Sequence, residues 1–399
     1  MTSLDVAVAS CFWACLALIV YAYAGYPLMI WGLSRLFGRP AEVPDLGEVD
    51  LPPVSLLIAA YNEEAEIEDR LRNALAMDYP RERFEVVVGS DGSTDATARI
   101  VRRYADRGVR LLDYEQRRGK ASVLNAAFPE LRGEIVLLSD ANTHNDPQAA
   151  RKLVRWFRDP GVGAVCGRLV LTDPATGRNA DSLYWKYETF LKRCEGRLGA
   201  LLGANGAIYA IRKELYAPIP AETIVDDFVI PLLARVRTGC SIVYDCEAVA
   251  REETPPDVGS EFHRRSRIGA GGFQSIGMLW RLLDPRRGWV AFTFLSHKIL
   301  RWLCPFFLLG LLASNVALLA GDRPLYRYLL LGQVSSFLAS LLAAFVPAGR
   351  GPLKLLRLAA MFTGMNAALL VGFWRWLWGT QKGAWRRTAR LAEANGAAR

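Results

Sequence analysis

Hydrophobic residues follow two patterns along this chain, one typical of membrane spans and one typical of a folded α/β domain. Residues 6–32 contain no charged side chain and form a run long enough to cross a bilayer. Three later runs, at 302–320, 325–346 and 358–378, also have the length and apolar character of a span. The interrupted run at 269–283 is too short to span and is typical of a helix at the membrane surface.

The region between these segments alternates between short apolar runs and stretches in which apolar residues have helical spacing. The first run, VSLLIAA, is continuously apolar, as expected for a strand covered on both faces. In chain order the pattern predicts strands at 54–60, 84–91, 109–114 and 134–142, and helices at 63–75, 94–105 and 120–128. Strands that alternate with helices predict a parallel sheet in a doubly wound α/β domain.

These patterns divide the chain into six segments. We predict an N-terminal transmembrane helix at 1–39, a linker at 40–53 and the α/β domain at 54–255. Interfacial helices at 256–300, about three C-terminal transmembrane stretches at 301–380 and a basic tail at 381–399 follow. Asp5 precedes the first span whereas Arg35 and Arg39 follow it, so the positive-inside rule places the α/β domain in the cytosol. The expected location is the plasma (inner) membrane, with several spans.

The same rule leaves the side of the C-terminal tail open. A cytosolic domain followed by three spans places the tail outside, but Arg386, Arg387 and Arg390 favour the cytosol. Either one hydrophobic segment lies in the interface or re-enters, or the tail is an exception to the rule.

Composition narrows the class of protein. The net charge is +9, and beside membrane segments this excess favours a cytosolic face over nucleic-acid binding, so we expect no nucleic-acid partner. The seven cysteines are scattered, without a CxxC pair or a histidine at zinc-ligand spacing. We therefore expect reduced and mostly buried cysteines, which suit a cytosolic domain.

Polar residues follow the predicted strands. Asn62, Asp91, Lys120 and Asp140 each lie at or just beyond a strand tip or at the helix that follows. Ligands of doubly wound sheets bind at the carboxyl ends of the strands, so we expect these four side chains to converge. A helix cap would explain one isolated acid, such as Asp95, but a binding crevice explains four convergent side chains better.

The residue types at these tips limit the ligand. Asp91 only accepts hydrogen bonds, which suits the hydroxyl or N–H donors of a nucleoside and would repel a phosphate. Phosphates would require Lys120, Arg118 and a divalent cation. The dinucleotide fingerprint GxGxxG and the phosphate loop GxxxxGK[ST] are both missing, which excludes the corresponding hydride-transfer and P-loop classes.

Five motifs occur in order along the chain: AAYNEE, SDGSTD, the RRGK loop, SDAN, and VDD followed by HRRSRI. This series resembles the family-2 glycosyltransferases, whose catalytic domain has the α/β GT-A (Rossmann-like) fold. Within that family the chain is similar to the membrane-embedded synthases of hyaluronan, chitin, poly-N-acetylglucosamine and cellulose. The resemblance covers about residues 52–275 and extends to the flanking spans.

The resemblance implies a nucleotide site made from several motifs. The residues of this site would contact the base, ribose or diphosphate of a nucleotide sugar. The candidates are Tyr61, Asn62, Glu63, Asp91, Lys120, Arg264 and Arg267. Arg267 would clamp the leaving diphosphate, a task suited to a planar cation. For Arg264 and Arg265 a basic stripe on anionic lipid stays an equal alternative.

SDAN stands where the family has Asp-x-Asp, whose carboxylates hold Mg²⁺ or Mn²⁺ on the diphosphate. Asp140 fits this role, and Asn142 offers a neutral carbonyl oxygen in place of a second carboxylate. This departure either weakens the metal site or shifts ligation to a neighbour such as His144. The alternative is that SDAN only caps the next helix.

The acidic pair in TIVDDFVIP stands where the family has its catalytic base. The resemblance assigns Asp227 as the base that takes the acceptor hydroxyl proton and Asp226 as a supporting group. Adjacent carboxylates raise one pKa through repulsion and burial. The alternative is a helix start that carries acids at its positive end.

The resemblance also implies an acceptor site. In the family the stretch at 201–215 supplies a loop and a helix that line this site, with Gly203, Asn205 and Gly206 as its candidate residues. A simple tight turn is the alternative. Ile268 stands where the processive synthases have a tryptophan, so the loss of that aromatic platform leaves long-chain processivity open.

We expect an inverting β-glycosyltransferase that transfers a sugar from a nucleotide sugar, with UDP as the expected nucleotide, to a growing exopolysaccharide. One alternative is the transfer of a single sugar to a lipid or lipid-linked carrier. An alternative of another class is a non-catalytic partner of a synthase or transport complex, which the retained acidic motifs disfavour. The sequence names neither the sugar, the linkage nor the oligomeric state.

Overall fold

The computed structural model describes residues 3–39, 42–44, 47, 51–173, 183–253, 258–321, 323–343 and 353–383. The chain forms two compact units. The sheet unit comprises residues 30–257, 274–293 and 382–399, and the membrane unit comprises residues 1–29, 258–273 and 294–381. Parts of the predicted linker at 40–53 and of the predicted tail at 381–399 lie outside the described residues.

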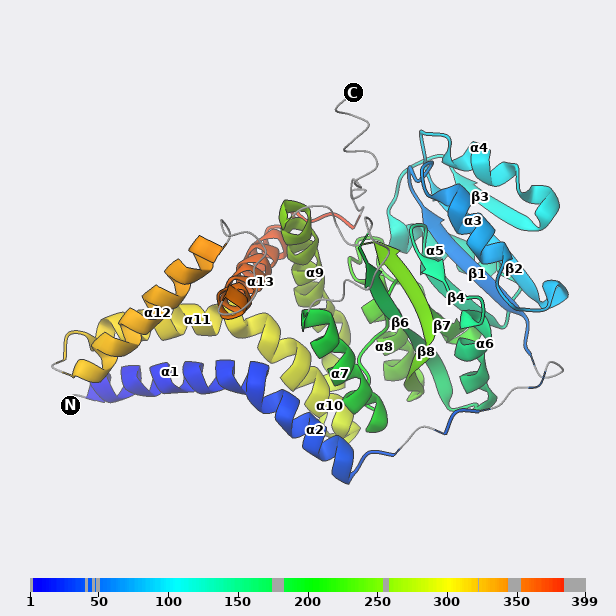
Figure 1. Cartoon of the computed structure of the whole chain (residues 1–399). Coiled ribbons are helices and arrows are strands. Elements are labelled where there is room, and N and C mark those ends of the chain that lie inside the picture. Colours follow the sequence, from blue (N-terminus) through cyan, green and yellow to red (C-terminus); the bar gives the residue numbers. More distant parts are fainter. Residues whose placement is uncertain are drawn as a thin grey trace. The chain divides into compact units, whose positions relative to one another are not determined.

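The sheet unit is built on one eight-stranded sheet, seen at the right of Figure 1. Its order is β3-β2-β1-β4-β7-β6-β8-β5. The strands are β1 (Val54–Ala60), β2 (Phe84–Asp91), β3 (Val109–Tyr114), β4 (Ile135–Asp140), β5 (His144–Asn145), β6 (Val162–Thr172), β7 (Tyr209–Arg212) and β8 (Ser241–Glu253). Its helices are α3 (Ile67–Leu75), α4 (Thr97–Arg102), α5 (Lys120–Ala127), α6 (Ala149–Val154), α7 (Leu183–Arg197), α8 (Asp226–Thr238) and α10 (Trp289–Thr293).

The first half of the sheet follows the sequence pattern closely. Strands β1, β2 and β3 have the predicted bounds, and every residue of β1 is buried, as its continuous apolar run requires. Helices α3 and α4 pack on the face that carries Leu56 and Val88. Helix α5 covers the opposite face, where Gly89 leaves the space that the Val123 side chain fills.

The prediction of a parallel sheet is confirmed for β1–β4 and for the pair β6 and β8, and it is wrong for β7 and β5, which run antiparallel to their neighbours. Strands β1, β2, β3 and β4 are parallel, whereas β7 runs antiparallel to both β4 and β6. The stretch at 201–215 forms a loop, then β7 and a single 3-10 turn at Lys213–Leu215, so the helix expected there is reduced to that turn. A run of only four strand residues carries too little periodicity to reveal its direction.

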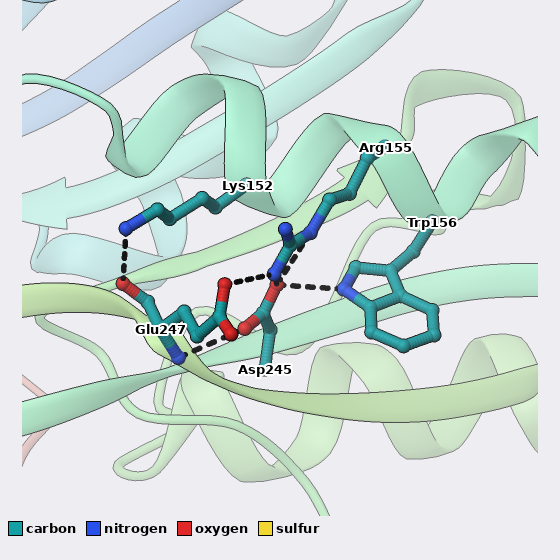
Figure 2. A network of polar contacts seen from close by, with 5 residues as sticks. All are labelled: Lys152, Arg155, Trp156, Asp245 and Glu247. Atoms are coloured by element: carbon teal, nitrogen blue, oxygen red, sulfur yellow. Dashed lines mark hydrogen bonds and ion pairs between the residues drawn. The ribbon is translucent and has the colours of Figure 1, made fainter. Parts of the chain in front are cut away.

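A buried polar network fixes the second half of the sheet at an irregularity between β6 and β8. The pairing shifts from Gly167–Asp245 to Arg168–Val249, which leaves a bulge in β8. Asp245 Oδ2 accepts hydrogen bonds from Arg155 Nη2 at 2.8 Å and from Trp156 Nε1 at 2.7 Å (Figure 2). Asp245 Oδ1 accepts from the Glu247 amide in the bulge at 2.9 Å. One buried carboxylate therefore joins the bulge to the segment that follows α6.

The membrane unit contains α1 (Ser3–Val20), most of α9 (Val258–Leu279), α11 (Leu300–Leu318), α12 (Pro324–Ala343) and α13 (Leu353–Leu377). Helix α2 (Tyr26–Leu36) continues from α1 through a π-helical segment at Tyr21–Gly25, and a second π-helical segment, Phe294–Ile299, precedes α11. Tyr21 and Ser296 hydrogen-bond between these two segments, with 2.8 Å between their oxygens. Helix α1 packs along α11, as Figure 1 shows.

Four helical stretches in the described residues are long and apolar enough to cross a membrane. They are Ser3–Leu36, Trp289–Leu318, Pro324–Ala343 and Leu356–Leu377. These agree with the predicted spans, except that the second begins at Trp289, because a helix of five residues and a π-helical segment continue it backwards. All seven cysteines are free thiols, as expected.

We predict that Asp245→Ala strongly destabilises the sheet unit. Removing one partner of a buried ion pair costs about 3–5 kcal/mol, because the groups left behind are desolvated without compensation. Thermal unfolding in detergent should show a clearly lower midpoint. The matched control is Glu247→Gln, since Glu247 pairs with the same arginine but its side chain is 55% exposed, and such pairs contribute about 0–1 kcal/mol. Equal midpoints for the two variants would contradict the assigned role of Asp245.

Candidate active site

Several chain segments meet at the edge of the sheet where β1, β2 and β4 end. Asp140 is the last residue of β4, and Lys120 and Asp226 begin α5 and α8. Because β7 runs antiparallel to β4, the loop that leads into β7 lies at this same edge. The antiparallel strand therefore brings Gly206 to the tips of the parallel strands.

The centre of the site is one ammonium group among carboxylates. Lys120 Nζ lies 2.8 Å from Asp140 Oδ1 and 3.3 Å from Asp226 Oδ2. Burial alone would lower the pKa of Lys120, but Asp140, Asp226 and Asp227 together raise it above its ordinary value. Lys120 therefore stays charged and holds the carboxylates together.

Gly206 lies between these charged groups. A Cβ atom on Gly206 would lie 3.4 Å from Asp140 Oδ2, 3.4 Å from Asp227 Oδ2 and 3.6 Å from Lys120 Nζ. The Gly206 amide donates a 2.8 Å hydrogen bond to Asp227 Oδ2. The absence of a side chain thus leaves open the space that three charged side chains face. The predicted convergence of Lys120 and Asp140 is confirmed, and the acidic pair joins them.

Asp227 has the electrostatics of a proton acceptor near neutral pH. Burial and the neighbouring Asp226 raise its pKa to about 6, against the opposing effect of Lys120. Its Oδ1 accepts from the Phe228 amide at 3.0 Å. Asp226 is buried, and its Oδ2 accepts no hydrogen bond, because the contact with Lys120 lacks hydrogen-bond geometry. This oxygen therefore pairs with Lys120 by charge and keeps the capacity to accept a hydrogen bond.

Asp91 has a contact that the sequence did not reveal. It is buried, and its two oxygens accept from the backbone amides of Arg118 and Gly119, at 2.7 and 2.8 Å. These bonds fix the loop that leads directly into Lys120. Asp91 thus helps to fix the position of Lys120 without contacting its ammonium group. The contact of Asp91 with a nucleoside stays a prediction.

The residues of AAYNEE are joined to the motif after β2. Asn62 adopts a left-handed backbone conformation with φ 53°, and its Oδ1 accepts from the Thr94 amide at 2.8 Å. The Glu63 amide donates to Thr97 Oγ1 at 2.8 Å. The Arg117 guanidinium stacks 3.8 Å above the Tyr61 ring, which is a cation–π contact. These three candidate nucleotide residues therefore lie on one connected surface.

The residues around Asp140 fit a hard divalent cation. The Asp140 side chain is 36% exposed, and Asn142 adds a carbonyl oxygen two residues later. No group of three or more acidic, histidine or cysteine side chains in the described part of the chain could hold a metal alone. A site of one carboxylate and one carbonyl suits Mg²⁺ or Mn²⁺, which take their remaining ligands from phosphates and water. His144, the alternative ligand, is exposed on β5.

The predicted acceptor loop contacts a lysine of α7 that the sequence analysis did not identify. Lys192 on α7 donates to Asn205 Oδ1, and Asn205 Nδ2 donates to the Gly167 carbonyl at 2.8 Å. Gly203 has φ 74°, and a Cβ there would lie 2.8 Å from a ring carbon of Phe228, so only glycine fits. These contacts fix the shape of the loop, and its role at an acceptor stays a prediction.

The last predicted residues lie on α9, in the membrane unit. Arg264 and Arg265 both bind Glu261, with N–O distances of 2.9 and 2.7 Å. Ile268 is 39% exposed. The roles of Arg264, Arg267 and Ile268 at the nucleotide or acceptor stay predictions.

Comparisons with known proteins identify the family of the sheet domain. Residues 55–216 match the model of glycosyl transferase family 2. The poly-beta-1,6-N-acetyl-D-glucosamine synthase of Staphylococcus aureus is 28% identical over 246 residues, which are 58% of this chain and 58% of that protein. The beta-monoglucosyldiacylglycerol synthase of Synechocystis is 26% identical over 313 residues, which are 74% of this chain and 64% of that protein. The match thus spans less than two thirds of the length of these relatives.

A solved structure resembles nearly the whole chain. It is the mannosyltransferase PcManGT from Pyrobaculum calidifontis in complex with GDP-Man and Mn²⁺. The two share 25% identity with a TM-score of 0.69, over 92% of this chain and 99% of that one. The fold and the resemblance predicted from the sequence are both confirmed. Residues 55–216 thus form a glycosyl transferase family 2 domain with the GT-A fold.

Proposed function

We propose that this membrane protein transfers a sugar, with inversion, from a nucleotide sugar to an acceptor at the membrane. The observation that carries the proposal is the cluster of Asp140, Asp226 and Asp227 around Lys120 and Gly206. The cluster contains a buried carboxylate with its pKa raised to about 6, which is the property required of a base that removes a hydroxyl proton near neutral pH.

Each member of the cluster has a task in this reaction. Asp227 takes the proton from the acceptor hydroxyl, and Asp226 keeps the Asp227 pKa high enough for that step. Lys120 lies beside the departing diphosphate, whose charge it offsets. Asp140 and Asn142 would hold a divalent cation, which supplies charge stabilisation to the diphosphate when bound. The Gly206 amide orients Asp227.

The proposed donor is a nucleoside diphosphate sugar, and a test is needed to identify its nucleobase. UDP is our expectation from the sequence. The mannosyltransferase that resembles this chain was solved with GDP-Man and Mn²⁺, which favours GDP as the second candidate. Both nucleotides therefore belong in any screen.

The favoured acceptor is a growing exopolysaccharide. The similarity to a poly-beta-1,6-N-acetyl-D-glucosamine synthase supports it. A single transfer to a lipid or lipid-linked carrier is the second candidate, which the similarity to a glycolipid synthase and the isoleucine at position 268 favour. Product size separates these two. The four apolar helices support a multi-pass protein, which we place in the inner membrane with its sheet unit in the cytosol.

We predict that the purified protein in detergent releases nucleotide from one of a panel of UDP and GDP sugars, and that Asp227→Asn lowers this turnover by about 10²–10⁴-fold. Asparagine keeps an acceptor for the Gly206 amide, so nucleotide binding should stay near normal. The matched control, Asp159→Asn, changes an exposed turn residue outside the cluster and should keep turnover within a few-fold. Nucleotide binding without release from any donor would instead support the non-catalytic alternative.

We also predict that turnover depends on a divalent cation. EDTA should stop nucleotide release, and excess Mn²⁺ or Mg²⁺ should restore it, because the diphosphate needs a counter-charge beside Asp140. Asp140→Ala should lose the activity that Mn²⁺ restores to the wild-type protein. Full turnover in excess chelator would show that the reaction proceeds without the metal.

A further inference from the structure

Asn142 has a charged partner from a distant strand. Its Nδ2 donates a 2.9 Å hydrogen bond to Glu252 Oε1, near the end of β8. An ionised carboxylate only accepts hydrogen bonds, so the NH₂ end of the amide must face Glu252 and the carbonyl end must face away from it. No described residue donates to that carbonyl oxygen, Oδ1. The contact thus presents a free carbonyl oxygen two residues after Asp140.

The backbone around this contact is fixed by β8 itself. Strand β5 pairs with β8, with His144 opposite Arg251 and Asn145 opposite Ala250. The Asp146 amide donates to the Val249 carbonyl at 3.0 Å, which continues the attachment along β8. The segment that follows Asp140 therefore lies against β8, and the spacing between positions 142 and 252 is set by a strand ladder.

The chemistry of an amide explains why such a partner matters at position 142. A carboxylate there would offer a metal either of two equivalent oxygens, whereas an amide offers one oxygen and, after a flip, an NH₂ group that repels a cation. An amide ligand must therefore be oriented. The negative charge of Glu252 also polarises the amide toward its oxygen.

We propose that Glu252 is a positioning residue of the metal site, which turns the Asn142 carbonyl toward the cation. The proposal deepens the metal-dependent transfer described above and rests on it. Glu252 does not touch the metal in this account. It acts through Asn142, so its effect is on the affinity for the cation.

The experiment measures Mn²⁺ affinity directly, by electron paramagnetic resonance of the purified protein with Mn²⁺ alone and with added UDP or GDP. Glu252→Gln should weaken Mn²⁺ binding by about 10–100-fold, as loss of an outer-sphere partner of a metal ligand does. A glutamine can satisfy the Asn142 amide in either orientation, so the side chain is no longer fixed. The apparent melting temperature should change little, because a hydrogen bond remains possible.

The sharper variant swaps the two groups. Asn142→Asp combined with Glu252→Gln reverses the polarity of the hydrogen bond, since the glutamine can donate to the new carboxylate, and either carboxylate oxygen can bind the metal. We expect this double variant to regain most of the Mn²⁺ affinity that Glu252→Gln loses. Glu253→Gln, which removes a charge from the exposed neighbouring residue, is the matched control and should bind Mn²⁺ like the wild type.

The proposal is overturned if Glu252→Gln binds Mn²⁺ within about twofold of the wild type, if the double variant binds no better than Glu252→Gln, or if the wild type binds no Mn²⁺ with either nucleotide. A role of Glu252 in folding alone would lower the melting temperature without this rescue, and it would also overturn the proposal. The expected affinities without any sugar transfer would support the inference and contradict the proposed function, so the two failures can be distinguished.

Discussion

The contact between the Lys120 ammonium and the carboxylates around it is the interaction on which the candidate site depends. Three acidic side chains from two distant parts of the chain repel one another when they are ionised in a low-dielectric site. Lys120 offsets this repulsion through contacts of 2.8 Å with Asp140 and 3.3 Å with Asp226. Without that cation, the repulsion among the three carboxylates would have no compensating positive charge.

The surrounding structure holds this lysine and its partners in place. Asp91 accepts two backbone hydrogen bonds from the loop before Lys120, and Gly206 donates one to Asp227. The antiparallel β7 brings the Gly206 loop to the edge where β4 delivers Asp140. The bulge in β8 is fixed by Asp245, and the far end of the same strand contacts Asn142 through Glu252. The sheet therefore serves as the frame for an electrostatic arrangement that no single segment contains.

The first half of the fold was predictable because its information is local. Apolar runs gave the bounds of β1, β2 and β3, and the polar residues at their tips indicated the binding edge. The direction of β7 was not predictable, because strand pairing depends on contacts that its four residues do not encode. Lys192 and Glu252 were missed for the same reason, since Glu252 lies 110 residues from its partner Asn142. The loop-holding role of Asp91 needs backbone geometry, which residue types alone do not supply.

The pH dependence of donor turnover tests the central claim most directly. A base must be ionised to accept a proton, so a pKa raised to about 6 means that kcat/KM falls as the pH drops through 6. Asp226→Asn removes a neighbouring negative charge and should lower the Asp227 pKa, which shifts this acidic limb to lower pH. The account predicts a wild-type limb near pH 6 that moves downward in Asp226→Asn. A limb that stays in place in the variant, or a wild-type profile that is flat from pH 5 to 7, would contradict it.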